Sequence, residues 1–268
     1  MSTNVNPFID IQLTLSRKEI IVQYKIDPAF QGRAPFTYEL LAYEDETFTN
    51  TVYIIPSDLF YIVDDTNNRQ NAEPSFFYKL RLTDANNKQY LSPFFGWHPS
   101  DSITQHHYLL ASEISRREKI RFNYAGLFAY ILKRKSYTAY QASEVDSITG
   151  EPLTDSTNTY GVGVNGGYYP PVLTRLSIED RESKQTYDEN GRGTQFTEII
   201  KCRCAGFPYV DEHDLIVTPD GKRFTVTSSN NKYFPGTTMI LLQMPEARLI
   251  PVTDTIYNIA VPTFPINE

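Results

Sequence analysis

Histidines and the acidic residues near them are where metal or acid–base chemistry would be expected in this sequence. The chain has four histidines: His98, His106, His107 and His213. His106 and His107 are adjacent, so a helix would point them in different directions, and the His-Glu-x-x-His spacing of zinc enzymes does not occur. The densest group of possible ligands, Asp211-Glu212-His213-Asp214, adjoins a predicted hairpin and is interpreted as a polar loop, with metal binding as the weaker alternative. We therefore expect no metal and no cofactor.

Two cysteines and a glycine-rich segment are the other candidates for chemistry. Cys202 and Cys204 lack the two-residue gap that redox and zinc motifs use, and they are predicted to be small buried hydrophobic side chains in a strand. We expect them to point to opposite faces of that strand, where they could not easily form a disulfide. The segment from Gly161 to Gly166 resembles a dinucleotide fingerprint only superficially, because no strand and helix flank it. The chain is predicted not to be an enzyme.

The charge of the chain is uneven along its length. The net charge is −7 and the isoelectric point is about 5.2, which excludes a chain-wide basic surface for nucleic acid. Residues 113–135 hold seven basic and two acidic residues, a local net of +5, so the remainder of the chain carries −12. Such asymmetry favours a basic face that meets an acidic neighbour or DNA phosphate. A helix face exposed to solvent is an equally good interpretation.

The elements that must position these residues are mainly strands. Tyr and Phe number 19 and 16, and Val, Ile and Thr are frequent, which favours pleated surfaces. Residues 1–98 are predicted to form a β-sandwich, because short alternating runs and turns follow one another at the spacing of an immunoglobulin-like fold. The predicted strands cover residues 8–13, 19–26, 36–43, 52–55, 60–63, 76–82 and 89–95. Trp97, with Phe94 and Phe95, is interpreted as packing rather than as a carbohydrate platform.

A loose motif near the end of this region resembles the last two strands of a fibronectin type III domain. It consists of Phe77-Tyr78-Lys79-Leu80-Arg81-Leu82-Thr83-Asp84 followed by Tyr90-Leu91-Ser92-Pro93. The resemblance covers about the first third of the chain and implies that Tyr78 is the corner tyrosine of that fold. Because this fold has many roles, it indicates only a binding or spacer module.

Residues 99–125 are predicted to be a helical linker, and residues 126–268 a β-barrel with long loops. Ser102 and Gln105 have the spacing of a capping box, and the helix is predicted to end near Arg121. The predicted barrel strands cover residues 127–135, 199–204, 214–218, 223–228, 238–244 and 256–261. Residues 141–165 and 179–193 are predicted to be long polar loops that are functional or ordered by a partner. The sequence has no signal peptide and no apolar run long enough to span a membrane, so synthesis in a cytoplasm is expected.

The second half of the chain resembles the head-closure or stopper type of neck protein of tailed bacteriophages. The resemblance covers roughly residues 100–262. It rests on Tyr130-Ile131-Leu132-Lys133-Arg134-Lys135, Asp146-Ser147-Ile148-Thr149-Gly150-Glu151-Pro152, Tyr160-Gly161-Val162-Gly163, Gly166-Gly167-Tyr168-Tyr169-Pro170-Pro171, Asp214-Leu215-Ile216-Val217-Thr218-Pro219-Asp220-Gly221-Lys222-Arg223-Phe224-Thr225-Val226, Leu242-Gln243 and Asp254-Thr255-Ile256-Tyr257. Many relatives carry paired cysteines where Tyr140, Ser156 and Thr159 stand here, so a zinc knuckle or disulfide is not expected.

The resemblance implies a structural subunit of a ring, in about six or twelve copies, around the channel through which the genome leaves. It further implies portal or adaptor proteins as partners on the head side, a tail terminator or completion protein on the tail side, genomic DNA that passes non-specifically through the lumen, and no membrane. The sandwich would decorate the ring as a collar in the virion. Candidate subunit contacts are Arg116, Arg117, Arg121, Lys133, Arg134, Tyr168 and Tyr169. The alternatives are a receptor- or carbohydrate-binding baseplate or fibre subunit and, with no residues found to support it, a lysin.

Overall fold

The computed structural model divides the chain into two compact units. The first consists of Met1–Arg116, Ser136–Tyr140 and Tyr233–Ile240, and the second of Arg117–Lys135, Gln141–Lys232 and Leu241–Glu268. The structure describes residues 6–15, 19–27, 29–30, 32, 35–43, 51–65, 77–96, 105–135, 146, 148–149, 151, 153, 156–187, 194–235 and 240–265, with only the backbone at 52–53, 96, 105–109, 184–187 and 194–197. In these residues the chain is mainly β with a single α-helix, as predicted.

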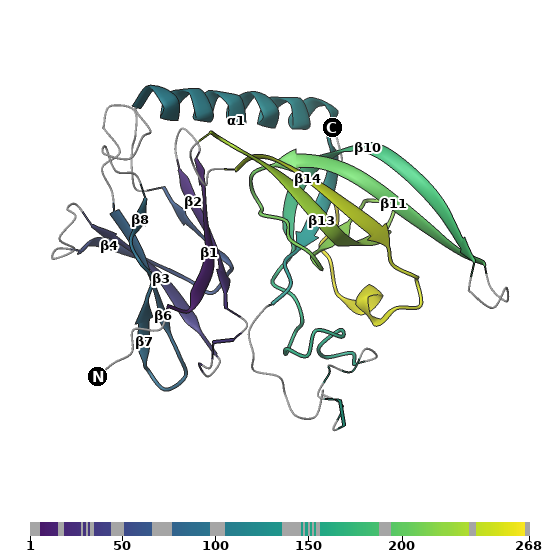
Figure 1. Ribbon diagram of the computed structural model, residues 1–268, viewed down its shortest axis with the longest axis horizontal. Helices are drawn as coiled ribbons and strands as arrows, with labels where there is room; N and C mark the ends of the chain where they lie inside the picture. Colours follow the sequence, from purple (N-terminus) through teal and green to yellow (C-terminus); the bar gives the residue numbers. More distant parts are fainter. Residues whose placement is uncertain are drawn as a thin grey trace. The chain divides into compact units, whose positions relative to one another are not determined.

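The first unit contains two antiparallel sheets (Figure 1). One sheet has the order β1-β2-β5 and the other β4-β3-β6-β7, with β8 added to β6. The strands are β1 (Phe8–Leu15), β2 (Ile20–Ile26), β3 (Thr37–Tyr43), β4 (Thr51–Ser57), β5 (Tyr61–Asp64), β6 (Phe77–Thr83), β7 (Gln89–Leu91) and β8 (Phe95–Gly96). One sheet holds the first, second and fifth strands and the other sheet holds the rest, an order compatible with the predicted immunoglobulin-like sandwich.

Aromatic rings fill the space between these two sheets. The ring of Tyr24 on β2 lies 4.9 Å from that of Tyr38 on β3 and 5.7 Å from that of Phe8 on β1. Tyr78 is buried on β6, and its hydroxyl donates a 2.6 Å hydrogen bond to the buried carboxylate of Asp64 on β5. Tyr78 therefore links the two sheets. The segment before β6, where a corner tyrosine would find its backbone acceptor, lies outside the described residues.

The helix α1 spans Gln105–Ala125, four residues further than predicted. Phe122 is buried, so packing extends the helix past Arg121. The helix ends at Gly126, whose N–H donates to the Phe122 carbonyl at 2.8 Å. A Cβ at Gly126 would lie only 2.4 Å from that same carbonyl oxygen, which explains why glycine follows the last turn. The capping residue Ser102 lies outside the described residues.

The second unit is a closed six-stranded barrel with the order β10-β11-β14-β13-β12-β9. Its strands are β9 (Leu127–Leu132), β10 (Val172–Tyr187), β11 (Thr194–Ala205), β12 (Leu215–Val217), β13 (Arg223–Tyr233) and β14 (Ile240–Leu249). The short β12 pairs with β9 and with β13 and so closes the barrel. A C-terminal barrel was predicted, and the fold class is confirmed.

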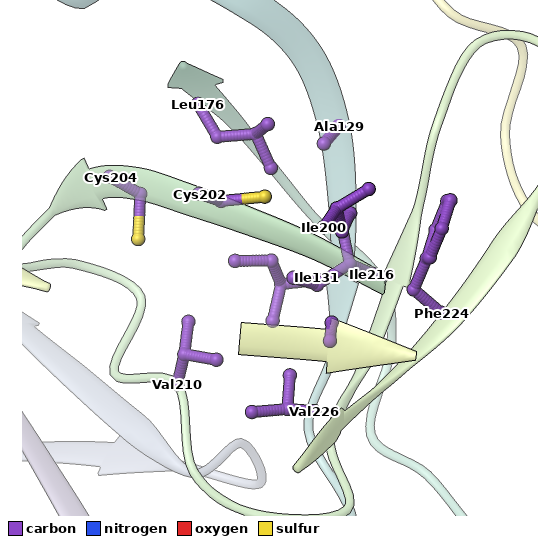
Figure 2. Packing of buried hydrophobic residues seen from close by; sticks show 11 residues of the cluster. Ala129, Ile131, Leu176, Ile200, Cys202, Cys204, Val210, Ile216, Phe224 and Val226 are labelled. Carbon is purple, nitrogen blue, oxygen red and sulfur yellow. The ribbon is translucent and has the colours of Figure 1, made fainter. Parts of the chain in front are cut away.

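Inward-facing side chains fill the barrel (Figure 2). The buried cluster comprises Ala129, Ile131, Leu176, Ile200, Cys202, Cys204, Val210, Ile216, Phe224, Val226 and Ala247. Both cysteines belong to it as free thiols, so the prediction that they face opposite sides of the strand was wrong. Residues two apart in a strand share one face, and the alternation of β11 therefore turns both thiols into the core.

The second polar stretch, residues 179–193, was predicted to be a loop, and this was wrong for most of it. Residues 179–187 continue β10 and pair with β11 up to Tyr187, opposite Thr194. Strand β9 pairs with β10 only as far as Leu176, and β14 pairs with β11 only from Ile199. Residues 180–187 and 194–198 thus form a two-stranded extension, here called the arm, which projects beyond the barrel (Figure 1).

The C-terminal segment was predicted to form a strand at residues 256–261, and this was wrong. It contains a 3₁₀ helix, Thr255–Asn258, capped by the Asp254 carboxylate. The segment packs over outward-facing residues of β9 and β12. Those residues are Tyr130, Leu132, Leu215 and Val217, and the segment covers them with Ile256, Tyr257, Ile259, Val261 and Phe264. We call residues 250–265 the strap.

Candidate subunit-contact surface

Lys133 and Asp214 form a buried ion pair at the point where the barrel closes. Leu132 on β9 pairs with Leu215 on β12, and Lys133 and Asp214 are the next residues along these antiparallel chains. The Lys133 Nζ lies 2.8 Å from the Asp214 Oδ2, and the two side chains are only 7% and 1% exposed. The ammonium also lies 3.4 Å from the Tyr209 carbonyl and 4.8 Å from the centre of the Tyr209 ring. Lys133 is therefore inside the fold and presents almost no surface to another subunit.

The carboxylate of Asp214 is the acceptor at the centre of this network. Its Oδ1 accepts the N–H of Arg134 at 2.9 Å, and its Oδ2 accepts the N–H of Asp211 at 2.8 Å. Burial raises the pKa of Asp214, and the Lys133 ammonium with the two backbone N–H groups opposes this rise. With these partners, a buried carboxylate is satisfied rather than available to a ligand.

Arg134, Tyr168 and Tyr169 connect the same corner of the barrel to the glycine-rich segment. Arg134 and Tyr168 form an isolated antiparallel bridge, and the Tyr169 N–H donates to the Lys133 carbonyl at 2.9 Å. Tyr168 packs against the cluster beneath the strap, and burial raises the pKa of its hydroxyl to about 12. The Lys135 ammonium donates a 3.0 Å hydrogen bond to the Asn165 carbonyl. These residues hold the glycine-rich loop in place, and the contacts between subunits predicted for Arg134, Tyr168 and Tyr169 stay a prediction.

The loop itself, residues 156–167, is ordered by its own hydrogen bonds. Four glycines of the loop have positive φ angles, which glycine adopts at little cost: Gly161, Gly163, Gly166 and Gly167. Tyr160 also has a positive φ, of 50°. The Ser156 hydroxyl accepts the N–H of Thr159 at 3.1 Å, and Thr159 is fully buried. The hydrogen bond to Ser156 and the burial of Thr159 therefore hold this part of the loop in place. Of residues 141–155, the structure describes only 146, 148–149, 151 and 153.

The three arginines of α1 that were predicted as subunit contacts are all exposed, but they differ in their ion pairs. Arg116, in the first unit, forms a bidentate pair with Glu113 at 2.7 and 2.8 Å. In the second unit Arg117 is exposed, and Arg121 lies 3.5 Å from Glu118. Exposed pairs of this kind contribute roughly 0–1 kcal/mol each. Arg117 and Arg121 are both exposed, and their role between subunits stays a prediction.

The arm and the adjoining barrel strands carry ion pairs on both faces. Lys201 lies 3.0 Å from Glu182 and 3.8 Å from Asp180. On the other face, Glu198 lies 2.6 Å from Lys222 and 3.7 Å from Arg181. Both faces are thus polar where the barrel core ends. Sequence reasoning missed the arm, although the opposite charges on its two strands are a signal of cross-strand pairing.

The residues considered for metal or acid–base chemistry are only partly described by the structure. Among the described residues, no group of three His, Cys, Asp or Glu side chains could hold a metal ion. His213 is exposed in a turn with a φ of 67°, and its N–H donates to the Val226 carbonyl. His98, Trp97 and the side chains of His106 and His107 lie outside the described part. Within that part, no helix is long and apolar enough to cross a membrane.

Comparisons of the whole chain with known proteins identified no relative. Neither the models of protein families nor the curated protein sequences gave a match.

Proposed function

We propose that the chain is a structural subunit of the neck of a tailed bacteriophage. In this role it forms part of the ring that joins the portal or adaptor to the tail and lines the channel through which the genome leaves. Its place is in the virion, its partners are the neighbouring neck proteins and copies of itself, and it performs no catalysis. The sandwich is a collar domain on the ring.

The observation that carries this proposal is the convergence of the family-like segments on one corner of the barrel. The Tyr130–Lys135 motif supplies β9 and Lys133, the Asp214–Val226 motif supplies β12, β13 and Asp214, and the segment around Tyr168 bridges to Arg134. The Asp254–Tyr257 motif forms the strap that covers β9 and β12. Segments far apart in the sequence thus build one structural unit, as expected if they are parts of one conserved type of fold.

Two further features are consistent with an assembly role. The barrel interior is filled by side chains, as in small barrels that serve as scaffolds rather than as ligand carriers. The arm projects beyond the barrel with no other described strand paired to its edges. A two-stranded ribbon is marginally stable alone, so a neighbouring protein that packs on it would stabilise it.

The proposal is tested by locating the chain on virions. Negative-stain electron microscopy with an antibody against the purified chain should place the label at the junction of head and tail. The same antibody after absorption with the purified chain is the control for specific labelling. Label at the tail tip would favour the receptor-binding alternative, and a chain that is absent from virions would overturn the proposal.

A further inference from the structure

The second half of α1 exposes a stripe of residues whose types are common in protein interfaces. Arg117, Ile120, Arg121 and Tyr124 recur at intervals of three and four residues, which places them on one face of the helix. Tyr124 is 90% exposed and Ile120 is 39% exposed. Phe122 points to another side of the helix and is buried. We call these four exposed residues the α1 stripe.

The composition of the α1 stripe favours a protein partner. Tyrosine and arginine are enriched among the residues that dominate binding energy, because they combine apolar area with polar groups. Removing Ile120 and the ring of Tyr124 from water stabilises a complex, but only if the partner offers an apolar surface. A protein surface offers one, whereas the phosphate groups of a nucleic acid do not.

The charge distribution of the chain identifies the partner. The helix residues 113–125 that carry the stripe have four basic and two acidic side chains, a net of +2, whereas the remainder of each copy carries −9. We propose that the α1 stripe docks on an acidic surface of a second copy of this chain. The contact is heterologous, because a basic face of one copy meets a different, acidic face of the next, and repeated contacts of this type close into a ring.

The inference rests on the proposed function, since a ring needs such a contact, and it specifies which residues form one side of it. It also changes the set of contact residues predicted from the sequence. Lys133 is excluded because its ammonium is buried against Asp214. Ile120 and Tyr124 are added because they are exposed beside Arg117 and Arg121.

A photo-cross-linking experiment on the purified full-length chain tests the contact. Tyr124 is replaced by p-benzoylphenylalanine, and the matched control carries the same residue at Val252, which is 76% exposed in the same unit. Irradiation should give a covalent dimer from position 124 and not from position 252. Mass spectrometry should locate the partner peptide in a segment rich in Asp and Glu.

Charge reversal tests the electrostatic part of the proposal. In the position-124 background, R117E/R121E should lower the dimer yield about tenfold, since charged groups in an interface are each worth 1 kcal/mol or more. K232E/R248E makes the same change in net charge at exposed positions elsewhere in the unit and should leave the yield within about twofold. Circular dichroism checks that each variant is folded.

Several outcomes would overturn the inference. These are the absence of a dimer at any accessible concentration, equal yields from positions 124 and 252, insensitivity to R117E/R121E, and preferential cross-linking to added duplex DNA. The result is independent of the location of the chain on virions. A label at the neck without the cross-link would reject the α1 contact alone, whereas the cross-link with a label at the tail tip would reject the neck.

Discussion

The Nζ of Lys133 and the Oδ2 of Asp214, 81 residues apart in the sequence, lie 2.8 Å apart inside the barrel. Lys133 follows β9 and Asp214 precedes β12, so their contact fixes the register of the two strands that close the barrel. Arg134 and Asp211 add backbone N–H groups to the same carboxylate. Lys133, one of the residues that the sequence analysis assigned to subunit contacts, is thus part of the internal structure that holds the barrel together.

Loss of one partner of this pair should destabilise the barrel strongly. Lys133→Met leaves the Asp214 carboxylate buried without its cation, and the free energy of unfolding should fall by about 3–5 kcal/mol. Chemical denaturation followed by circular dichroism measures the loss, and hydrogen exchange of peptides from β9 and β12 localises it. Lys201→Met, at an exposed ion pair, is the control and should leave the free energy of unfolding nearly unchanged. Equal effects of the two variants would contradict the assigned role.

The loop that precedes β10 should tolerate no side chain at Gly167. An added Cβ would lie 2.7 Å from the Thr159 carbonyl oxygen, and the φ of 56° is itself unfavourable for alanine. Gly167→Ala should therefore cost about 2–4 kcal/mol of unfolding free energy. Gly221→Ala is a matched control, because Gly221 has a φ of 78° but nothing within 4 Å of its Cβ position, and it should cost only about 1 kcal/mol. Thermal unfolding distinguishes the two, and similar losses would show that the close contact does not matter.

The elements that repeat with period two were predictable from the sequence. Strands β2, β3 and β6 of the sandwich and β9 and β13 of the barrel lie where runs of apolar residues predicted strands, and burial alternates most clearly along β5 and β6. Alternation reports directly which face of a strand is buried. The helix was also predicted, but its end was not, because burial of Phe122 depends on tertiary packing.

The failures came from features that depend on partners distant in sequence. Residues 179–187 are charged and resemble a loop by composition, yet they form a strand because β11 provides both hydrogen bonds and opposite charges. Residues 256–261 alternate like a strand but find no free edge on a closed barrel, so they pack outside it as the strap. The Lys133–Asp214 contact required knowledge of barrel closure, which no local pattern contains.

The two core cysteines should be unreactive until the barrel opens. Burial raises the pKa of Cys202 to about 12 and that of Cys204 still further. The thiolate is the nucleophile, and at pH 8 only about one Cys202 side chain in ten thousand is a thiolate. Burial in the barrel core also blocks the access of a reagent to both thiols. Iodoacetamide should therefore modify neither residue in the native chain at pH 8 but both in denaturant, as counted by intact mass. A Ser228→Cys variant, whose added thiol lies at an exposed position, should gain one rapid adduct. Rapid modification of the native chain at Cys202 or Cys204 would contradict the core assignment.

Arg223 should hold the strap on the barrel. Its guanidinium donates to the carbonyl of Ile256 and, at 2.7 Å, to that of Ile259, and it lies 5.1 Å from the ring centre of Tyr257. Arg223→Met removes both hydrogen bonds and should cost about 1–3 kcal/mol. Hydrogen exchange should accelerate in residues 250–261 while β10 and β11 stay protected. Arg203→Met, at a partly exposed pair with Glu179, is the control and should leave the strap unchanged. Uniform acceleration throughout the barrel would instead indicate a global effect.

The arm should be dispensable for folding and necessary for assembly. Glu182 pairs with Ile199, so residues 183–198 can be replaced by Asn-Gly, a two-residue turn that joins antiparallel strands directly. None of the residues in the barrel core cluster lies in the deleted segment. The free energy of unfolding should therefore change by no more than about 1 kcal/mol, mainly through loss of the Glu198–Lys222 ion pair. If the chain is the proposed neck subunit, the shortened chain expressed during infection should be soluble but absent from virions, as measured by quantitative mass spectrometry of purified particles. A variant with Lys201→Ala, which removes the ion pair and keeps the arm, should still be incorporated. Incorporation of the shortened chain at normal levels would show that the arm makes no essential contact in the virion.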